Sequence, residues 1–197
     1  MKLKLPLFLL FGLAIFTIGC NSGSDGSSAA VGSFDTAGYE TTDLGSGITH
    51  LIKQDGGGFP IEEGYLHNGV KSGVWTVYHP DGIQIKSLTS YINGALSGPM
   101  ITLDTRSQME SLKTYGNNQL NGLSATYKFG KVVTELPYKN GQIDGVFKEY
   151  LNGKLQRKID YVNGKKDGML TYYDEEGNKT VEYEYKNDEK ISGGMIE

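Results

Sequence analysis

The sequence predicts an all-β protein: one elongated, twisted antiparallel sheet of consecutive β-hairpins, with about eleven strands. Three observations predict this fold. A phrase of about two dozen residues recurs along most of the 197-residue chain. Each copy contains Asn-Gly or a similar pair that favours a tight hairpin turn. The runs between turns are five to nine residues long, which is typical of strands rather than helices.

The first 19 residues are predicted to be a signal peptide. Lys2 and Lys4 precede an apolar run, residues 5–19, which is too short to span a bilayer comfortably and ends at Cys20, the single cysteine. Gly19-Cys20 resembles the lipobox of bacterial lipoproteins, although Thr17 stands where that family prefers Leu. The resemblance implies a lipid on Cys20; an ordinary secretory signal or an N-terminal anchor helix are the alternatives.

Residues 20–43 contain the predicted lipidated Cys20 and a Gly/Ser-rich stretch, which indicates a flexible tether. Removal of the signal peptide leaves 17 basic and 23 acidic residues, a net charge of −6. Nucleic acids and anionic lipids attract clustered Lys and Arg, so this balance argues against both as direct partners. We therefore expect a bacterial envelope protein held to the membrane by its N-terminal lipid, with the outer membrane favoured because Asn21 is not the Asp associated with inner-membrane retention.

The repeat aligns on a tyrosine that precedes each turn, with intervals of 26, 24, 23, 23 and 24 residues. A half-repeat opens the predicted repeat domain, residues 44–193, and residues 194–197 form a C-terminal tail. Residues expected to be structural are the tyrosines Tyr65, Tyr91, Tyr115, Tyr138, Tyr161 and Tyr185, the turn glycines Gly69, Gly94, Gly141 and Gly164, and the second glycines Gly73, Gly98, Gly122, Gly145 and Gly168.

The pattern Tyr-x-Asn-Gly-x-x-x-Gly, as in residues 138–145 and 161–168, resembles the MORN repeat in its bacterial variant. The resemblance implies an extended ribbon of consecutive β-hairpins. Two copies depart from the pattern: residues 98–107 lack the Tyr and the Gly turn, and Asn117-Asn118 replaces Asn-Gly. Similar bacterial proteins are labelled antitoxin-like, and membrane association is proposed for eukaryotic relatives.

Turn length predicts which side chains share a face. A two-residue turn at Asn152-Gly153 pairs Tyr150 with Leu155, and stepping by two then places Ile159 and Tyr161 beside them. The same counting puts charged residues on the other face. Trp75, Phe147 and Tyr172 fall on that charged face, which makes these three aromatic side chains the predicted partner-binding residues, with cover by the stems of charged neighbours as the alternative.

The residues give no sign of catalysis, of a cofactor or of a small-molecule substrate. The three histidines, His50, His67 and His79, lack the spaced Cys or acidic residues of a metal site. Asp174-Glu175-Glu176 matches part of a calcium loop but lacks its alternating ligands, which favours a solvated turn. We therefore expect no enzyme and no bound metal.

Three functions remain in order of expectation. The first is a lipid-anchored, non-enzymatic module that binds an unknown protein partner through the repeat surface. The second is an antitoxin or immunity-like protein whose acidic residues attract a basic toxin. The third is direct binding to membrane lipids, which the net negative charge disfavours.

Overall fold

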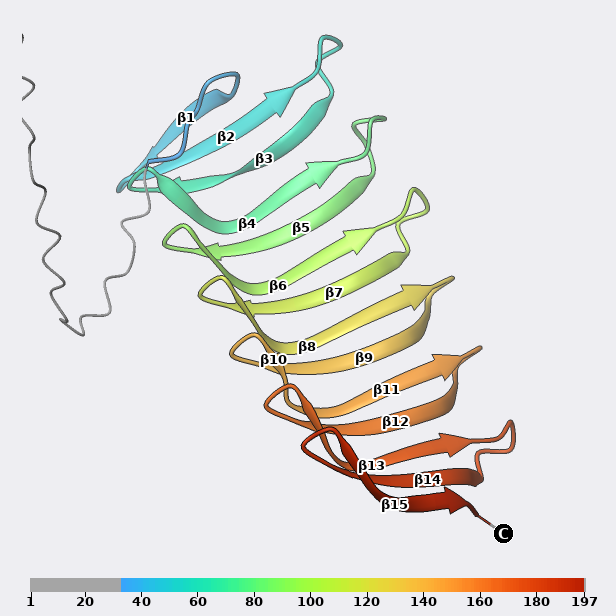
Figure 1. Ribbon diagram of the computed structural model, residues 1–197. Coiled ribbons are helices and arrows are strands. Elements are labelled where there is room, and N and C mark those ends of the chain that lie inside the picture. Colours follow the sequence, from blue (N-terminus) through green and yellow to red (C-terminus); the bar gives the residue numbers. More distant parts are fainter. Residues whose placement is uncertain (1–32, 197) are drawn as a thin grey trace, which may run out of the picture. The chain divides into compact units, whose positions relative to one another are not determined.

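The structure is a computed structural model, and it describes residues 33–196. These residues form one open antiparallel sheet in which strands pair in chain order, so the predicted fold of consecutive hairpins is confirmed (Figure 1). Residues 33–196 contain no helix that is long and apolar enough to span a membrane. The strands are β1 (Glu40–Gly45), β2 (Ile48–Gln54), β3 (Pro60–His67), β4 (Val70–Tyr78), β5 (Ile85–Ile92), β6 (Ala95–Leu103), β7 (Met109–Gly116), β8 (Gln119–Lys128), β9 (Lys131–Lys139), β10 (Gln142–Ile143), β11 (Gly145–Leu151), β12 (Lys154–Val162), β13 (Lys165–Tyr173), β14 (Lys179–Lys186) and β15 (Glu189–Met195).

The sheet has fifteen strands rather than about eleven. β1 includes residues 40–43, which were assigned to the tether, and β15 runs from the degraded last repeat into the tail. β10 is a short strand separated from β11 by Asp144. Pro137 on β9 lacks the N–H that a continuous ladder needs, and its carbonyl accepts a hydrogen bond from Asp144 N at 3.0 Å.

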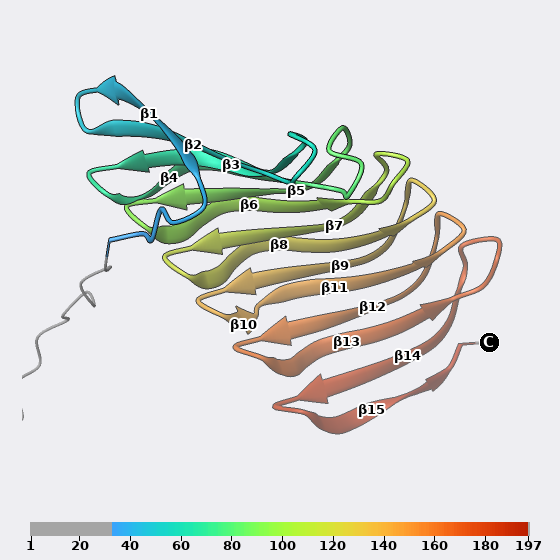
Figure 2. The ribbon, with the colours of Figure 1, turned by 90° about the horizontal axis from the view of Figure 1, so that it is seen from above.

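The predicted Asn-Gly turns are confirmed as hairpin turns. Both residues of each pair have positive φ, for example 49° at Asn163 and 81° at Gly164, as a two-residue turn that follows the strand twist requires. The turns that follow the repeat tyrosines also bind the hairpin before them: for example, Gly164 N donates to Ile143 O at 2.8 Å. These hydrogen bonds link successive repeats along one edge of the ribbon (Figure 2).

The departure at Asn117-Asn118 has a structural reason. Asn118 adopts φ of 66° without being glycine, and its Oδ1 accepts a hydrogen bond from Leu96 N at 2.8 Å. Asp188 does the same for Lys166 N in the last turn. A side-chain acceptor therefore adds a second bond between hairpins at the two turns that lack glycine.

The second glycine of each repeat marks a bulge. Gly73, Gly98, Gly122, Gly145 and Gly168 all have φ between 72° and 120°, a region that disfavours any side chain. The pairing register shifts beside them, as between Ile159 and Tyr161 opposite β13. The strands curve at this place, near the Asn-Gly end of each hairpin (Figure 1).

Directly opposed residues lie on the same face of a sheet, so the register defines two faces. Face A carries the row that runs through the middle of the strands at Leu51, Gly64, Trp75, Thr89, Met100, Lys113, Ser124, Leu136, Phe147, Ile159, Leu170 and Tyr183. Face B carries the neighbouring row at Glu63, Thr76, Leu88, Ile101, Leu112, Ala125, Glu135, Lys148, Lys158, Thr171 and Glu182.

The predicted grouping of Tyr150, Leu155, Ile159 and Tyr161 on one face is wrong. Tyr150 does pair with Leu155, but Glu149 pairs with Arg157, so the register shifts by one residue between them. This bulge places Tyr150 on face B and leaves Ile159 and Tyr161 on face A. Stepping by two holds only where no extra residue intervenes.

Tyr65 also differs from the other repeat tyrosines. It lies three residues before Asn68, whereas Tyr91 lies two residues before Asn93. The extra residue turns Tyr65 onto face B, where its side chain is 43% exposed, and places Leu66 on face A, where it is 4% exposed. Leu66 therefore occupies the face A position that Tyr91 occupies one repeat later.

Buried apolar side chains are few because most of the sheet is a single layer. Among residues 33–196 the buried apolar side chains are Leu51, Leu66, Trp75, Ala95, Ala125, Ile159 and Leu170. Leu51, Leu66 and Trp75 form one cluster at the N-terminal end, and Phe34, Tyr39 and Tyr91 pack against it. This cluster is where the fold acquires a second layer.

Candidate functional site

Trp75, the first predicted partner-binding residue, is not on an exposed charged face. It lies on face A and is 1% exposed, so that part of the prediction is wrong. Its indole occupies the space beside Gly64, where an added Cβ would lie 2.3 Å from Trp75 Cδ2. Its Nε1 donates a hydrogen bond to Tyr65 O at 3.0 Å. Trp75 is therefore a core residue, and its indole fits only because Gly64 has no side chain.

Residues 33–39 cover this end of face A, and we call them the strap. The Phe34 ring centroid lies 5.1 Å from that of Trp75, and Tyr39 meets Trp75 edge-on at 6.3 Å. Phe34 N donates to Gly69 O at 2.8 Å, and the Tyr39 hydroxyl donates to Glu62 at 2.8 Å. Burial, with help from Glu62, raises the pKa of Tyr39 above the usual tyrosine value. The strap belongs to residues 20–43, for which the sequence predicts a flexible tether.

Lys71 joins the strap to the sheet. Its Nζ lies 3.7 Å from the ring centroid of Trp75, 4.9 Å from that of Phe34 and 5.2 Å from that of Tyr91. The same Nζ pairs with Glu62 at 3.3 Å. An ammonium group surrounded by rings gains more than one in water because the rings exclude solvent. The strap, Lys71 and the indole therefore form one unit.

Phe147 and Tyr172, the other two predicted partner-binding residues, also lie on face A but are partly exposed. Arg157 connects them: its guanidinium lies 5.5 Å from the Phe147 ring centroid, and Arg157 pairs directly with Tyr172 across β12 and β13. Arg157 also forms an ion pair with Glu149. Burial opposes its charge, but Tyr172 and Glu149 outweigh burial and raise the pKa of Arg157. Both rings remain accessible beside a permanent positive charge.

The C-terminal half of face A carries further cations over tyrosines. Lys166 Nζ lies 5.0 Å from the ring centroid of Tyr185, and Lys190 Nζ lies 3.8 Å from that of Tyr183. Tyr161 on β12 and Tyr185 on β14 are half-buried. Leu170, on the intervening strand β13, is 5% exposed. Within the described residues, the strap contacts lie at β2 to β5, which leaves this half of face A bare.

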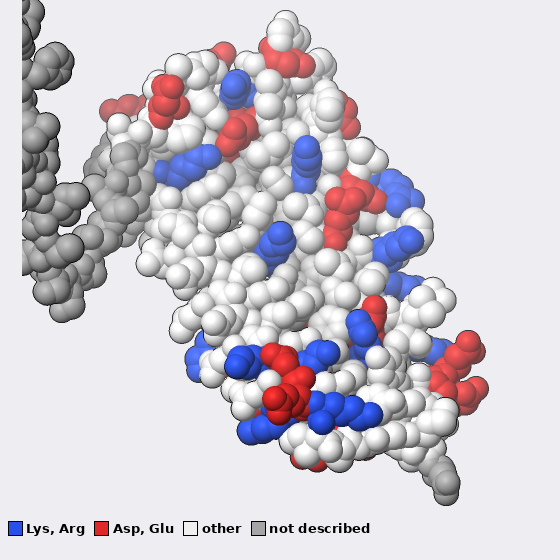
Figure 3. Space-filling view, viewed as in Figure 1, with Lys and Arg blue, Asp and Glu red and all other residues white. Residues whose placement is uncertain are grey.

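Face B is apolar in the middle of the sheet and charged toward its C-terminal end. Glu135 accepts from Lys148 at 3.3 Å and from the Tyr150 hydroxyl at 3.0 Å, and Glu182 accepts from Thr171. Figure 3 shows the opposite face, face A, on which charged side chains of both signs gather over the C-terminal strands and isolated charges lie over the middle ones. Part of the predicted charged face thus exists, but its acids are paired with neighbouring lysines and hydroxyls.

Two tyrosines of face B are held by these carboxylates. A hydrogen bond to Glu63, followed by burial, raises the pKa of Tyr78 to about 12. Burial, followed by a hydrogen bond to Glu135, raises the pKa of Tyr150 to about 12. Both hydroxyls stay protonated at neutral pH and donate to a carboxylate, so these tyrosines fix the sheet rather than supply a nucleophile.

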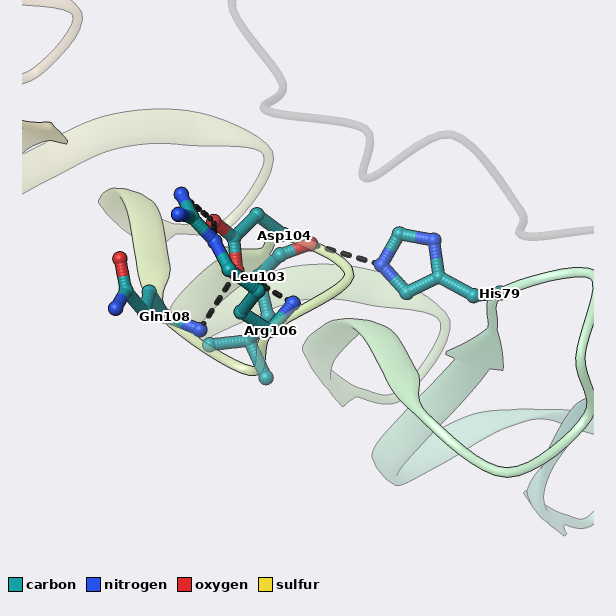
Figure 4. A network of polar contacts seen from close by, with 5 residues as sticks. All are labelled: His79, Leu103, Asp104, Arg106 and Gln108. Carbon is teal, nitrogen blue, oxygen red and sulfur yellow. Dashed lines mark hydrogen bonds and ion pairs between the residues drawn. The ribbon is translucent and has the colours of Figure 1, made fainter. Parts of the chain in front are cut away.

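The loops at the other edge of the sheet are closed by aspartates. Asp104 Oδ1 accepts from the backbone N–H groups of Arg106 and Gln108 at 2.8 and 2.9 Å, and these bonds lower the pKa of Asp104 (Figure 4). His79 Nε2 lies 3.1 Å from Leu103 O in the same network. Asp174 accepts from Asn178 N at 2.8 Å in the same way. The acidic stretch considered as part of a calcium loop is a turn, and residues 33–196 contain no group of three or more potential metal ligands.

One open apolar groove lies at the N-terminal end. Its volume is about 460 Å³, and Leu44, Ile48, Tyr65, Leu66, His67, Ser72 and Gly73 line it. Tyr65 reaches this groove because of its displaced position in the repeat. The lining of the groove contains no Lys, Arg, Asp or Glu.

Comparison with known families gives one match. The model of the MORN repeat variant family matches residues 143–163, which comprise the short strand β10 in part, β11, β12 and the following Asn. This match supports a MORN-repeat protein, and it coincides with one period of the structural repeat. A search of curated proteins returned no match to the chain. The predicted Cys20 attachment site lies outside the described residues.

Proposed function

We propose that this MORN-repeat protein is a lipid-anchored, non-enzymatic module of a bacterial envelope that binds a protein partner through face A. A MORN repeat suggests an interaction or membrane-binding module. The observation that carries the choice is the bare C-terminal half of face A, where the partly exposed Phe147 and Tyr172 flank the charged Arg157. Aromatic rings and arginine are the side chains that dominate protein interfaces.

The test is site-specific photocrosslinking in intact cells with the full chain. A crosslinking amino acid replaces Tyr172 on face A, and the matched control replaces Tyr173, the next residue on the opposite face. We expect one reproducible adduct from position 172, lost when Phe147→Ala is added, and none from position 173. Equal adducts from both positions, or none from either, would remove face A as the partner surface.

The anchor is tested separately. Cys20→Ala removes the only thiol that can carry the lipid, so the chain should leave the membrane fraction while keeping its sheet by circular dichroism. Lipid chains contribute roughly 0.8 kcal/mol per buried CH₂, which no single side chain replaces. A Cys20→Ala chain that stays fully membrane-bound would contradict lipid anchoring.

Direct membrane binding is the second candidate, and one observation favours it. Face B exposes apolar side chains in a line: Val74 is 49% exposed, Leu123 40% and Val146 39%. Flotation of the Cys20→Ala chain with uncharged vesicles separates this candidate from the first. Flotation that Leu123→Asp abolishes would support membrane contact through face B, and the absence of flotation would eliminate it.

A further inference from the structure

We propose that the C-terminal half of face A binds a short peptide segment in which an aromatic residue precedes an acidic one by five positions. This inference rests on the proposed function, because it names the partner chemistry of the same surface. The strap is its template: Phe34 and Tyr39 lie five positions apart on a short segment with one turn, in which Tyr39 N donates to Thr36 O at 3.1 Å. The turn brings the two rings within 5.5 Å of each other, and the segment docks on an earlier copy of the same repeat.

The docking contacts of the strap are of three kinds. A backbone hydrogen bond runs from Phe34 N to Gly69 O at 2.8 Å. The Phe34 ring packs on the indole and covers Lys71, with Nζ 4.9 Å from its centroid. The Tyr39 hydroxyl reaches Glu62 at 2.8 Å. A segment of seven residues thus spans face A from the Asn-Gly turn to the middle of β3.

The same platform recurs at the C-terminal end. Lys71 and Lys166 each stand two residues before a bulge glycine, Gly73 and Gly168. Both lysines lie over the tyrosine of the next strand, with Nζ-to-centroid distances of 5.2 Å at Tyr91 and 5.0 Å at Tyr185. Leu170 takes the place of Trp75, two residues after the glycine. A ring that covers Lys71 in the first copy would cover Lys166 in the later one.

One position differs between the two platforms and sets the chemistry of the ligand. Glu62 pairs with Val77, and Arg157 pairs with Tyr172; Val77 and Tyr172 both lie four residues after the bulge glycine. Arg157 therefore replaces the acceptor that Tyr39 uses. A guanidinium offers five N–H donors, so it can bind a second carboxylate besides Glu149. The ligand should end in an acidic group where the strap ends in a phenol.

The probes are three synthetic peptides titrated into the purified full-length chain in mild detergent. SFDTAGY copies residues 33–39, SFDTAGE replaces its last residue with an acid, and SADTAGE also removes the aromatic ring. We expect SFDTAGE to bind about tenfold more tightly than SADTAGE, and several-fold more tightly than SFDTAGY, as a desolvated ring and a charge-assisted hydrogen bond would give.

Protein variants locate the site. Arg157→Gln should abolish the preference for SFDTAGE over SFDTAGY, and Lys166→Ala should weaken both. Lys71→Ala is the matched control on the covered platform and should leave SFDTAGE binding unchanged, because Glu62 there repels an acid. Circular dichroism confirms the sheet in each variant, and Arg157→Gln keeps most of the side-chain volume.

Three outcomes would overturn the proposal. Binding that depends on Lys71 but not on Lys166 would mean that the peptide displaces the strap at the N-terminal end instead of binding at the C-terminal end. Concentration-dependent dimers that the peptides dissolve would mean that the occupant is the strap of a second copy. No binding at millimolar peptide would refute the ligand chemistry, while the crosslink from position 172 still decides the proposed function independently.

Discussion

The two ends of face A share one backbone plan and differ in what lies on top. At the N-terminal end, Trp75, Lys71 and the strap form a second layer, and the indole is 1% exposed. At the C-terminal end, Leu170 is also only 5% exposed, although the strap does not reach it, and its cross-strand neighbours on face A are Ile159 and Tyr183. The comparison teaches that the hairpin plan needs no second layer, so the cover at one end is an addition, and among residues 33–196 no segment covers the other end.

The largest effect expected is that of removing the indole. Trp75→Ala should lower the free energy of unfolding by about 3–5 kcal/mol, because it leaves a cavity and detaches the strap, whereas Leu170→Ala should cost about 2 kcal/mol. Urea unfolding followed by circular dichroism measures both. Equal losses at the two positions would show that the strap adds nothing.

Gly64→Ala tests the packing of the Trp75 indole by adding a methyl group to the residue that it contacts. Its Cβ would lie 2.3 Å from the indole, so we expect a loss of about 1–3 kcal/mol from overpacking. Gly56→Ala is the control, since nothing lies within 4 Å of its Cβ, and it should be nearly neutral. The single Trp reports the displacement of the strap by a red-shifted emission. An unchanged emission in Gly64→Ala would contradict the contact.

The two lysines form a matched pair with a smaller effect. Lys71 contacts three rings and Glu62, so Lys71→Ala should cost about 1–2 kcal/mol. Lys166 lies over a single ring, and its replacement by Ala should cost no more than about 0.5 kcal/mol. Denaturation midpoints measure both, and limited proteolysis within the strap should accelerate only in Lys71→Ala. A reversed order would contradict the difference between the platforms.

The smallest effect is a dependence on alkaline pH. Because the pKa of Tyr39 is raised on folding, folding keeps the phenol protonated while the unfolded chain ionises near pH 10. Its contribution is therefore complete below pH 10 and is lost as pH rises toward the folded pKa. Tyr39→Phe should cost less than about 1 kcal/mol at pH 7 and should flatten the fall in stability above pH 10. An unchanged slope would show that Tyr39 does not titrate differently in the folded state.

Most of the fold could be predicted because the turns are local. The Asn-Gly pairs require positive φ, and the structure places them in hairpin turns. The sequence does not predict β1 and β15 in full, because these edge strands lack a complete repeat and their residues are exposed throughout. The face assignment failed because each bulge adds a residue that no turn signal announces.

The candidate site was harder to predict because it depends on contacts distant in sequence. Phe147 and Tyr172 were singled out, but the bulges placed them on face A rather than on the charged face. Trp75 was misjudged because its cover comes from residues 33–39, which the Gly/Ser-rich composition assigned to a tether. Two signals were present: Phe34 and Tyr39 are the large aromatic residues of that stretch, and Gly64 leaves a gap of indole size.

Hydroxyl-radical footprinting of the full chain, purified and in intact cells, tests the central claim most directly. The account predicts that Trp75 is protected in both preparations, because the strap covers it. Phe147 and Tyr172 should react in the purified chain and become protected in cells, where the partner binds. Oxidation of Trp75 at the rate of Tyr172 in the purified chain, or no change at Phe147 and Tyr172 in cells, would contradict a covered end and a partner-binding end on the same face.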